Sequence, residues 1–207
     1  MCIRDRPNTD PWRDESGLKG PTALGLRRRF DAASQAWASE PVLVRLEREP
    51  FAHGAMRQCH RLKVLQSASR LFAGAGTNFV AKAYCGEPDS AILLEADVRM
   101  QAVAKSYAAQ FNAMGVPKPV DFVECWTLQL AERDAPPPPP GAFFSVECYL
   151  PGAFTKYSSN SGFVTDEVVR HTPHAFSHFT FEQSEGCEMV VDVQGVGDLF
   201  TLSLIHI

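Results

Sequence analysis

Asp192 and Gln194 are the side chains whose placement in this sequence most suggests chemistry. Asp192 follows the apolar run of residues 189–191, and Gln194 comes two positions later, beside Gly195 and Gly197. A carboxylate and an amide at the end of a buried strand are fixed by the scaffold, while the following loop leaves room for a ligand. An aspartate in a strand-end Asx turn explains the same spacing. Spacing alone favours the turn.

Lys82 is the candidate for binding phosphate. It lies in N-F-V-A-K-A-Y (residues 78–84), and an ammonium on a strand can neutralise the charge of nucleotide phosphates. A lysine on a solvated strand face is the commoner arrangement, so this segment by itself does not decide the matter. The G-A-G of residues 74–76 is only a fragment of a phosphate loop. The G-V-G of residues 195–197 has no helix after it, so we reject a dinucleotide-binding fingerprint.

Three histidines, His171, His174 and His178, lie close together in the sequence. His174 and His178 would share a helix face at i and i+4, a geometry that can chelate a metal. No glutamate stands between them as H-E-x-x-H requires, and ordinary core or surface histidines are favoured. Nucleophilic hydrolysis is disfavoured too, because Ser177 lacks a G-x-S-x-G elbow and no cysteine has a catalytic context.

The composition is that of an ordinary globular protein of 207 residues, enough for one sizeable core. A net charge of −4 gives no case for binding nucleic acid, and the cluster Arg27 to Arg29 is interpreted as a solvated helix face. No apolar run is long enough to span a membrane, and residues 1–6 contain no signal-peptide core, so we expect a cytoplasmic protein without a membrane partner. Six single cysteines are expected to be reduced and mostly buried.

The elements that must position these residues begin after a flexible N-terminal segment. A weak helical pattern covers residues 24–37, strand-like composition begins at residue 41, and the globular domain is expected to start there. Further strands are predicted at residues 55–65, 78–84, 122–130, 143–150 and 188–192. Helices are predicted at residues 91–114 and 173–181. This order indicates an α+β domain with a sheet-rich first lobe.

A proline run at residues 136–140 interrupts this pattern. Because proline donates no backbone hydrogen bond, such a run cannot join a sheet and is expected to form a surface loop. A loop is a simpler interpretation than a ligand for an SH3-type domain.

Seven blocks occur in the order found in one protein family. They are PFAHGAMRQCHRLKVL, NFVAKAY, EADVRMQAVAKSYAAQFN, VECYLPG, KYSSNSGFV, TPHAFSHFTFEQS and VVDVQGVGDLFT. From about Asp10 to Thr201 the chain resembles the alpha-kinase family of atypical protein kinases. The resemblance implies a sheet-rich N-lobe with one long helix and the beginning of a C-lobe. It also implies ATP-dependent serine/threonine kinase activity without the H-R-D and D-F-G motifs of ordinary kinases.

The resemblance assigns roles to individual residues. Lys82 matches the ATP lysine, and Arg57 matches an arginine that faces the phosphates. Asp192 matches the aspartate that orients or deprotonates the substrate hydroxyl, and is also a candidate magnesium ligand; Gln194 matches a magnesium-binding amide. His178 matches the first ligand of a structural zinc. The nucleotide-lining matches are the hinge residues Glu147, Cys148, Tyr149 and Leu150, with Lys156 and Asn160 beyond them.

The sequence departs from the family pattern at its ends. A second magnesium-binding aspartate is expected about ten residues after Asp192, where this chain has Leu202, and the glycine-rich loop and other zinc ligands would lie further on. We therefore expect residues 1–40 to be a flexible regulatory segment and residues 41–201 a partial catalytic domain. Residues 202–207, like MCIRDR at the start, are expected to be non-native.

The resemblance also implies partners. Elongation factor 2 is the expected substrate, with a consequent slowing of translation, and calcium-calmodulin is expected to bind the full-length protein through a region whose last part resembles residues 10–12. The activity of the incomplete domain is left open. The alternative is a non-catalytic, pseudokinase-like fragment that binds nucleotide or calmodulin.

Overall fold

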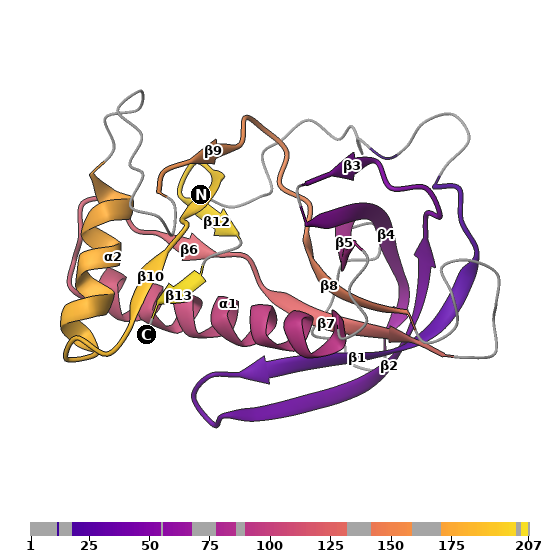
Figure 1. Cartoon of the computed structure of the whole chain (residues 1–207), viewed down its shortest axis with the longest axis horizontal. Helices are drawn as coiled ribbons and strands as arrows, with labels where there is room; N and C mark the ends of the chain where they lie inside the picture. The colour runs from indigo at the N-terminus through magenta and orange to yellow at the C-terminus, as the bar shows by residue number, and fades with distance from the viewer. Residues whose placement is uncertain are drawn as a thin grey trace.

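The computed structural model describes residues 12, 18–54, 56–67, 78–85, 90–131, 142–158, 171–201 and 204–206 (Figure 1). Asn160, Leu202 and the proline run at 136–140 lie outside the described residues. Among the described residues, no helix is long and apolar enough to cross a membrane.

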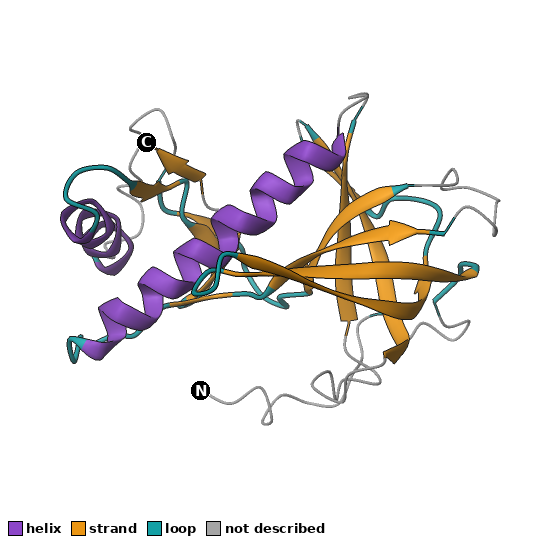
Figure 2. Ribbon diagram, turned by 90° about the horizontal axis from the view of Figure 1, so that it is seen from below, coloured by secondary structure: helices purple, strands orange, loops and turns teal. Residues whose placement is uncertain are grey.

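A seven-stranded antiparallel sheet forms the first lobe. Its strand order is β2-β1-β7-β8-β5-β4-β3, and β2 also pairs with β4, so the strands from β2 to β4 close into a barrel (Figure 2). Closure leaves few unpaired strand edges. The strands are β1 (Thr22–Asp31), β2 (Ala36–Leu46), β3 (Ala52–His53), β4 (Arg57–Ser67), β5 (Asn78–Tyr84), β7 (Cys125–Leu130) and β8 (Phe143–Cys148).

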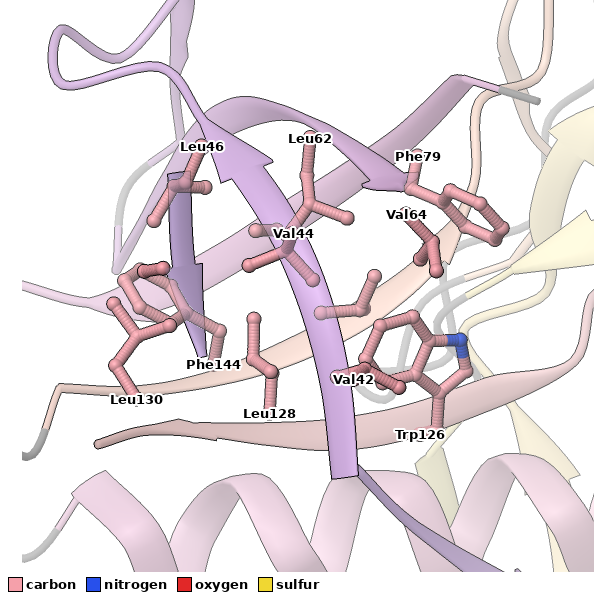
Figure 3. Close-up of a cluster of buried hydrophobic side chains, with 13 residues drawn as sticks. Val42, Val44, Leu46, Leu62, Val64, Phe79, Trp126, Leu128, Leu130 and Phe144 are labelled. Atoms are coloured by element: carbon pink, nitrogen blue, oxygen red, sulfur yellow. The ribbon is translucent and has the colours of Figure 1, made fainter. Parts of the chain in front are cut away.

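The interior of the barrel is an apolar core. Alternate residues of each strand point inward, as the two-residue period of a strand requires, and the labelled side chains of Figure 3 converge from five strands. The aromatic members of this core are Phe79 of β5, Trp126 of β7 and Phe144 of β8. Burial of this apolar surface is the main force that holds the barrel together. The labelled side chains are Val42, Val44, Leu46, Leu62, Val64, Phe79, Trp126, Leu128, Leu130 and Phe144.

The long helix α1 (Ser90–Ala113) crosses the outside of the barrel and continues into the second lobe (Figures 1 and 2). Near its start it contacts β1, β5, β7 and β8, where Leu94 and Val98 are fully buried. Further along, Ala108 and Phe111 belong to the core of the second lobe. The outward-facing side chains of the barrel strands that α1 covers are therefore enclosed between sheet and helix.

The described part of the second lobe consists of short strands and the helix α2. One sheet has the order β6-β12-β11-β9, and β10 pairs with β13. Its core is aromatic, with Phe122, Phe176 and Phe200 fully buried. The elements are β6 (Asp121–Phe122), β9 (Thr155–Lys156), α2 (Thr172–Gln183), β10 (Met189–Val191), β11 (Gln194–Val196), β12 (Leu199–Thr201) and β13 (Leu204–His206).

The predicted helix at residues 24–37 is wrong. These residues form β1 and the start of β2, which pair from Thr22 opposite Arg45 to Asp31 opposite Ala36. The sheet thus begins at Thr22 rather than at residue 41, and a flexible segment through residue 40 is contradicted for residues 22–40. Arg27 does not lie on a solvated helix face: it is 2% exposed and pairs with Glu40.

The other predicted elements are confirmed with small shifts, except that the strand expected at residues 122–130 is divided into β6 and β7. The five described cysteines are free, as expected. The expectation that they are mostly buried is wrong, because Cys85 and Cys187 are exposed and the others only half-buried. Residues 204–206, which were expected to lie in a non-native tail, pair with β10.

Candidate active site

Lys82 and Glu147 form a buried ion pair on the outer face of the barrel. Strands β5 and β8 are neighbours, and the Lys82 Nζ lies 2.5 Å from the Glu147 Oε1. The two residues are 7% and 6% exposed, so Lys82 does not stand on a solvated strand face. A buried ion pair needs further hydrogen bonds to offset the desolvation of its charges.

Thr201 supplies such a bond from the second lobe. Its hydroxyl donates to the other carboxylate oxygen of Glu147, Oε2, at 2.5 Å. Thr201 ends β12, and in the β11–β12 ladder its register partner is Gln194. The Lys82 ion pair is thereby linked to the strand that carries Gln194, two residues after Asp192.

Arg57 lies in a second polar cluster on the same outer face. It is the first residue of β4, and its Nη2 is 2.7 Å from the Asp97 Oδ2 of α1 and 2.6 Å from the Tyr84 hydroxyl. The Tyr84 hydroxyl also donates to Asp97 Oδ2 at 3.1 Å, and the guanidinium lies over the Tyr84 ring. Burial raises the pKa of Asp97, although the charge of Arg57 opposes this. The planar guanidinium is thus held in one orientation.

Asp192 lies directly after β10 in a conformation that aspartate adopts infrequently. Its φ is +57°, in the left-handed region, where asparagine and aspartate are tolerated better than most side chains. The Lys156 Nζ lies 2.7 Å from Asp192 Oδ1, and the Gln194 amide nitrogen lies 3.3 Å from Oδ2. Val193 N donates to the Ser158 hydroxyl, which ties this turn to the segment after β9. Unusual backbone at a fixed carboxylate is a feature of functional sites.

The Asp192 turn has donors that suit magnesium. Carboxylate and side-chain amide oxygens are hard donors, the class that Mg²⁺ prefers, and the two side chains are neighbours, with the Gln194 amide nitrogen 3.3 Å from Asp192 Oδ2. Two protein ligands are enough for an ion that keeps several waters and also binds substrate phosphates.

Tyr149 and Leu150 connect the two lobes. They follow β8 and lead through Pro151 and Gly152 to β9 of the second lobe. The Tyr149 N donates to the Asn78 O at 2.8 Å, which fixes the start of this connection to β5. The side chain of Glu147, also predicted as a hinge residue, is engaged by Lys82 and Thr201.

Trp12 packs against this connection. Its ring centroid lies 5.1 Å from that of Tyr149 and 5.9 Å from that of Phe51, and Trp12 is only 5% exposed. A residue from the N-terminal segment thus belongs to the packed structure.

The polar residues of this site lie within the range matched by a protein-family model. The model of the alpha-kinase family matches residues 52–207, about three quarters of the chain. The chain belongs to the alpha-kinase family.

Curated relatives of this alpha-kinase chain include elongation factor 2 kinases. The human protein of that name is 40% identical over 199 residues, which cover 95% of this chain and 26% of the human protein. The Caenorhabditis elegans protein is 40% identical over 197 residues, with similar coverage. Myosin heavy chain kinase B of Dictyostelium discoideum is 35% identical over 170 residues. The chain spans about a quarter of the length of the first of these relatives.

Solved structures of the family have the same fold. The alpha-kinase domain of myosin heavy chain kinase A in complex with AMP superposes with a TM-score of 0.80 and 32% identity, covering 90% of this chain and 85% of that one. The same domain in complex with ADP gives a TM-score of 0.79 and 33% identity. The predicted α+β alpha-kinase fold is therefore confirmed.

His178 lies away from these contacts. It is on α2, its side chain is 74% exposed, and its Nε2 is 3.8 Å from the Glu182 Oε1. Within the described ranges, no group of three or more His, Cys, Asp or Glu side chains could hold a metal. A zinc site at His178 stays a prediction.

Three residues of the site were not predicted from the sequence: Tyr84, Asp97 and Thr201. Asp97 is a polar position on a mostly apolar helix face, one turn after Leu94 and next to Val98, both fully buried. That pattern is a signal for a buried, paired carboxylate. The sequence contains no such signal for Thr201, because threonine is common in strands whether or not its hydroxyl has a special partner.

Proposed function

We propose that this alpha-kinase chain is the catalytic region of an ATP-dependent serine/threonine kinase that phosphorylates translation elongation factor 2 and so slows elongation. The observation that carries the proposal is the path from Lys82 through Glu147 to Thr201, whose ladder partner Gln194 lies beside Asp192. It joins a phosphate-binding cation in one lobe to a catalytic carboxylate in the other.

ATP would lie between the two lobes. Lys82 and Arg57, each oriented by a buried carboxylate, face the phosphates, and the connection at Tyr149 and Leu150 holds the adenine. The relatives in complex with ATP, ADP and AMP support nucleotide binding here. Lys156, and Asn160 outside the described residues, line the same site.

Magnesium would be held by Gln194 and Asp192, and when bound it supplies positive charge to the phosphate oxygens. Asp192 places the acceptor hydroxyl and takes its proton, while Lys156 keeps the carboxylate oriented at 2.7 Å. Phosphoryl transfer depends on positioning and electrostatic stabilisation more than on covalent help from the protein, which fits a site built from ion pairs.

For the full-length protein we propose three further properties. Calcium-calmodulin binds near its N-terminal segment, and the protein acts in the cytoplasm. His178 is one ligand of a structural zinc site whose other ligands lie outside this chain. The human and C. elegans relatives, which are elongation factor 2 kinases by name, support this substrate.

The test is phosphorylation of purified elongation factor 2 by the full-length protein with Mg-ATP, with and without calcium-calmodulin. We expect phosphate on serine or threonine, stimulated by calcium-calmodulin, and loss of at least about a thousandfold in rate for Asp192→Ala, as for removal of a positioned acid-base group together with its electrostatic role. Transfer to a generic basic peptide but not to elongation factor 2 would refute the substrate. Equal transfer by wild type and Asp192→Ala would refute the mechanism.

A further inference from the structure

Among the hydrogen bonds and ion pairs of the described residues, the Thr201 hydroxyl makes the one contact between the second lobe and the Lys82 ion pair. Lys82 occupies Oε1 of Glu147 and Thr201 occupies Oε2, each at 2.5 Å. Since both oxygens are engaged, the plane of the carboxylate is fixed. Thr201 is 2% exposed, so water has little access to replace its hydroxyl.

Thr201 is itself rigidly placed. It follows Phe200, which is fully buried, and it ends a strand whose ladder partner is β11. The two strands approach closely at Gly195, where a Cβ would clash with the Leu199 carbonyl oxygen. A shift of β11, which carries Gln194, must therefore shift the Thr201 hydroxyl as well.

We propose that Thr201 is a positioning residue that sets the place of the Lys82 ammonium through Glu147 and couples it to the Gln194 strand. The inference rests on the proposed function, in which Lys82 binds ATP phosphates and Gln194 binds magnesium. The hydroxyl competes with Lys82 for the charge of Glu147. By donating to Oε2, it weakens the hold of the carboxylate on the ammonium and leaves Lys82 available to phosphate.

Loss of the hydroxyl has a defined consequence. Glu147 would then have one buried oxygen without a donor, and its charge would fall entirely on Lys82. The ammonium would be drawn toward Glu147 and away from the nucleotide. The affinity for ATP should therefore fall, whereas the rate of phosphoryl transfer at Asp192 should stay the same once ATP is bound.

The experiment compares Thr201→Val, which keeps the shape but lacks the hydroxyl, with Thr201→Ser, which keeps the hydroxyl. The full-length protein is titrated with Mg-ATP to measure its Kd, and KM for ATP and kcat are measured in parallel. We expect Thr201→Val to raise Kd and KM by about tenfold, equivalent to about 1.4 kcal/mol, with kcat within about threefold. Thr201→Ser should stay within about twofold of wild type.

Thr127→Val is the matched control. Thr127 is also a fully buried strand threonine, but its hydroxyl has no hydrogen-bond partner in the part of the chain that the structure describes. Its Kd for ATP should equal that of wild type. If Thr201→Val fails to fold, Thr201→Ala, which removes the hydroxyl together with the methyl group, must show at least the same rise, and Thr201→Ser, which lacks only the methyl group, controls for the lost packing.

The outcomes separate the inference from the proposed function. Wild type that binds no Mg-ATP overturns the proposed function and the inference with it. Wild type that binds Mg-ATP, with a hydroxyl-free variant that is folded and binds equally well, overturns the inference alone. A Thr201→Ser variant as weak as Thr201→Val also overturns it, because the loss of affinity would then not depend on the hydroxyl.

Discussion

At the scale of residues, each cationic side chain of the site is already paired with a carboxylate. Each lies within 2.7 Å of a carboxylate oxygen, and the pairs are Lys82 with Glu147, Arg57 with Asp97, and Lys156 with Asp192. Such pairing keeps buried charges tolerable in the absence of ligand and orients them in advance. Because these side chains nearly cancel one another's charge, the proposed site would rely on magnesium to balance a triphosphate.

Removal of one charge of the Lys82–Glu147 ion pair should destabilise the protein more than removal of both charges. Lys82→Met leaves Glu147 buried with only Thr201 as a donor, and should lower the free energy of unfolding by about 3 kcal/mol. The double variant Lys82→Met with Glu147→Gln removes the stranded charge and should recover at least about half of that loss. Urea unfolding followed by circular dichroism measures both, and a double variant no more stable than the single one would contradict the pairing.

The residues of the site were only partly predictable. Lys82, Asp192 and Gln194 stood out because their types and strand-end positions suggest chemistry, but spacing favoured a solvated lysine and a turn aspartate. Burial, at 7% exposure, excludes a solvated Lys82, and Asp192 lies in a turn that Lys156 approaches from a different segment. Both depend on tertiary contacts that no local pattern encodes.

At the scale of elements, the β1–β2 hairpin shows where local pattern misleads. In β1 the apolar Leu24 and Leu26 point outward, at 54% and 39% exposure, while Ala23 and the charged Arg27 are buried. The two leucines therefore occupy the face opposite to the one that burial rules predict. The long helix α1 was predictable because its apolar residues recur with helical period, from Leu94 and Val98 beside the barrel to Ala108 and Phe111 in the core of the second lobe.

Gly195 predicts how tightly β11 and β12 must approach. Because a Cβ there would meet the backbone of Leu199 and Phe200, Gly195→Ala should force the strands apart and cost about 2 kcal/mol of stability. Gly54→Ala is the control, since its Cβ would lie 3.5 Å from the Arg57 O, an ordinary contact. Thermal unfolding of the two variants checks this. Equal melting temperatures for Gly195→Ala and Gly54→Ala would contradict the close approach of β11 and β12.

At the scale of the whole molecule, α1 is the element common to both lobes. It bonds to the barrel through Asp97 and to the second lobe through Tyr107, whose hydroxyl donates to the Glu188 Oε2 at 2.8 Å. Burial and the neighbouring Glu188 raise the pKa of Tyr107 to about 12. The hydroxyl therefore stays a hydrogen-bond donor across the physiological range.

Trp12 predicts that the N-terminal segment stabilises the connection between the lobes. Trp12→Ala removes a buried indole from Tyr149 and Phe51 and should lower the free energy of unfolding by about 3 kcal/mol. Trp12→Phe keeps an aromatic ring there and should lose less than half as much. Urea unfolding of the three proteins is the measurement. Equal stability of Trp12→Ala and wild type would show that this packing contributes nothing.

The central claim is that one nucleotide site joins the two lobes of this alpha-kinase chain. A crystal structure with magnesium and a non-hydrolysable ATP analogue tests it most directly. We expect phosphate oxygens within hydrogen-bonding distance of Lys82 and Arg57, adenine against Tyr149 and Leu150, and magnesium on Gln194. A nucleotide bound elsewhere, or one whose phosphates contact neither Lys82 nor the metal at Gln194, would contradict it.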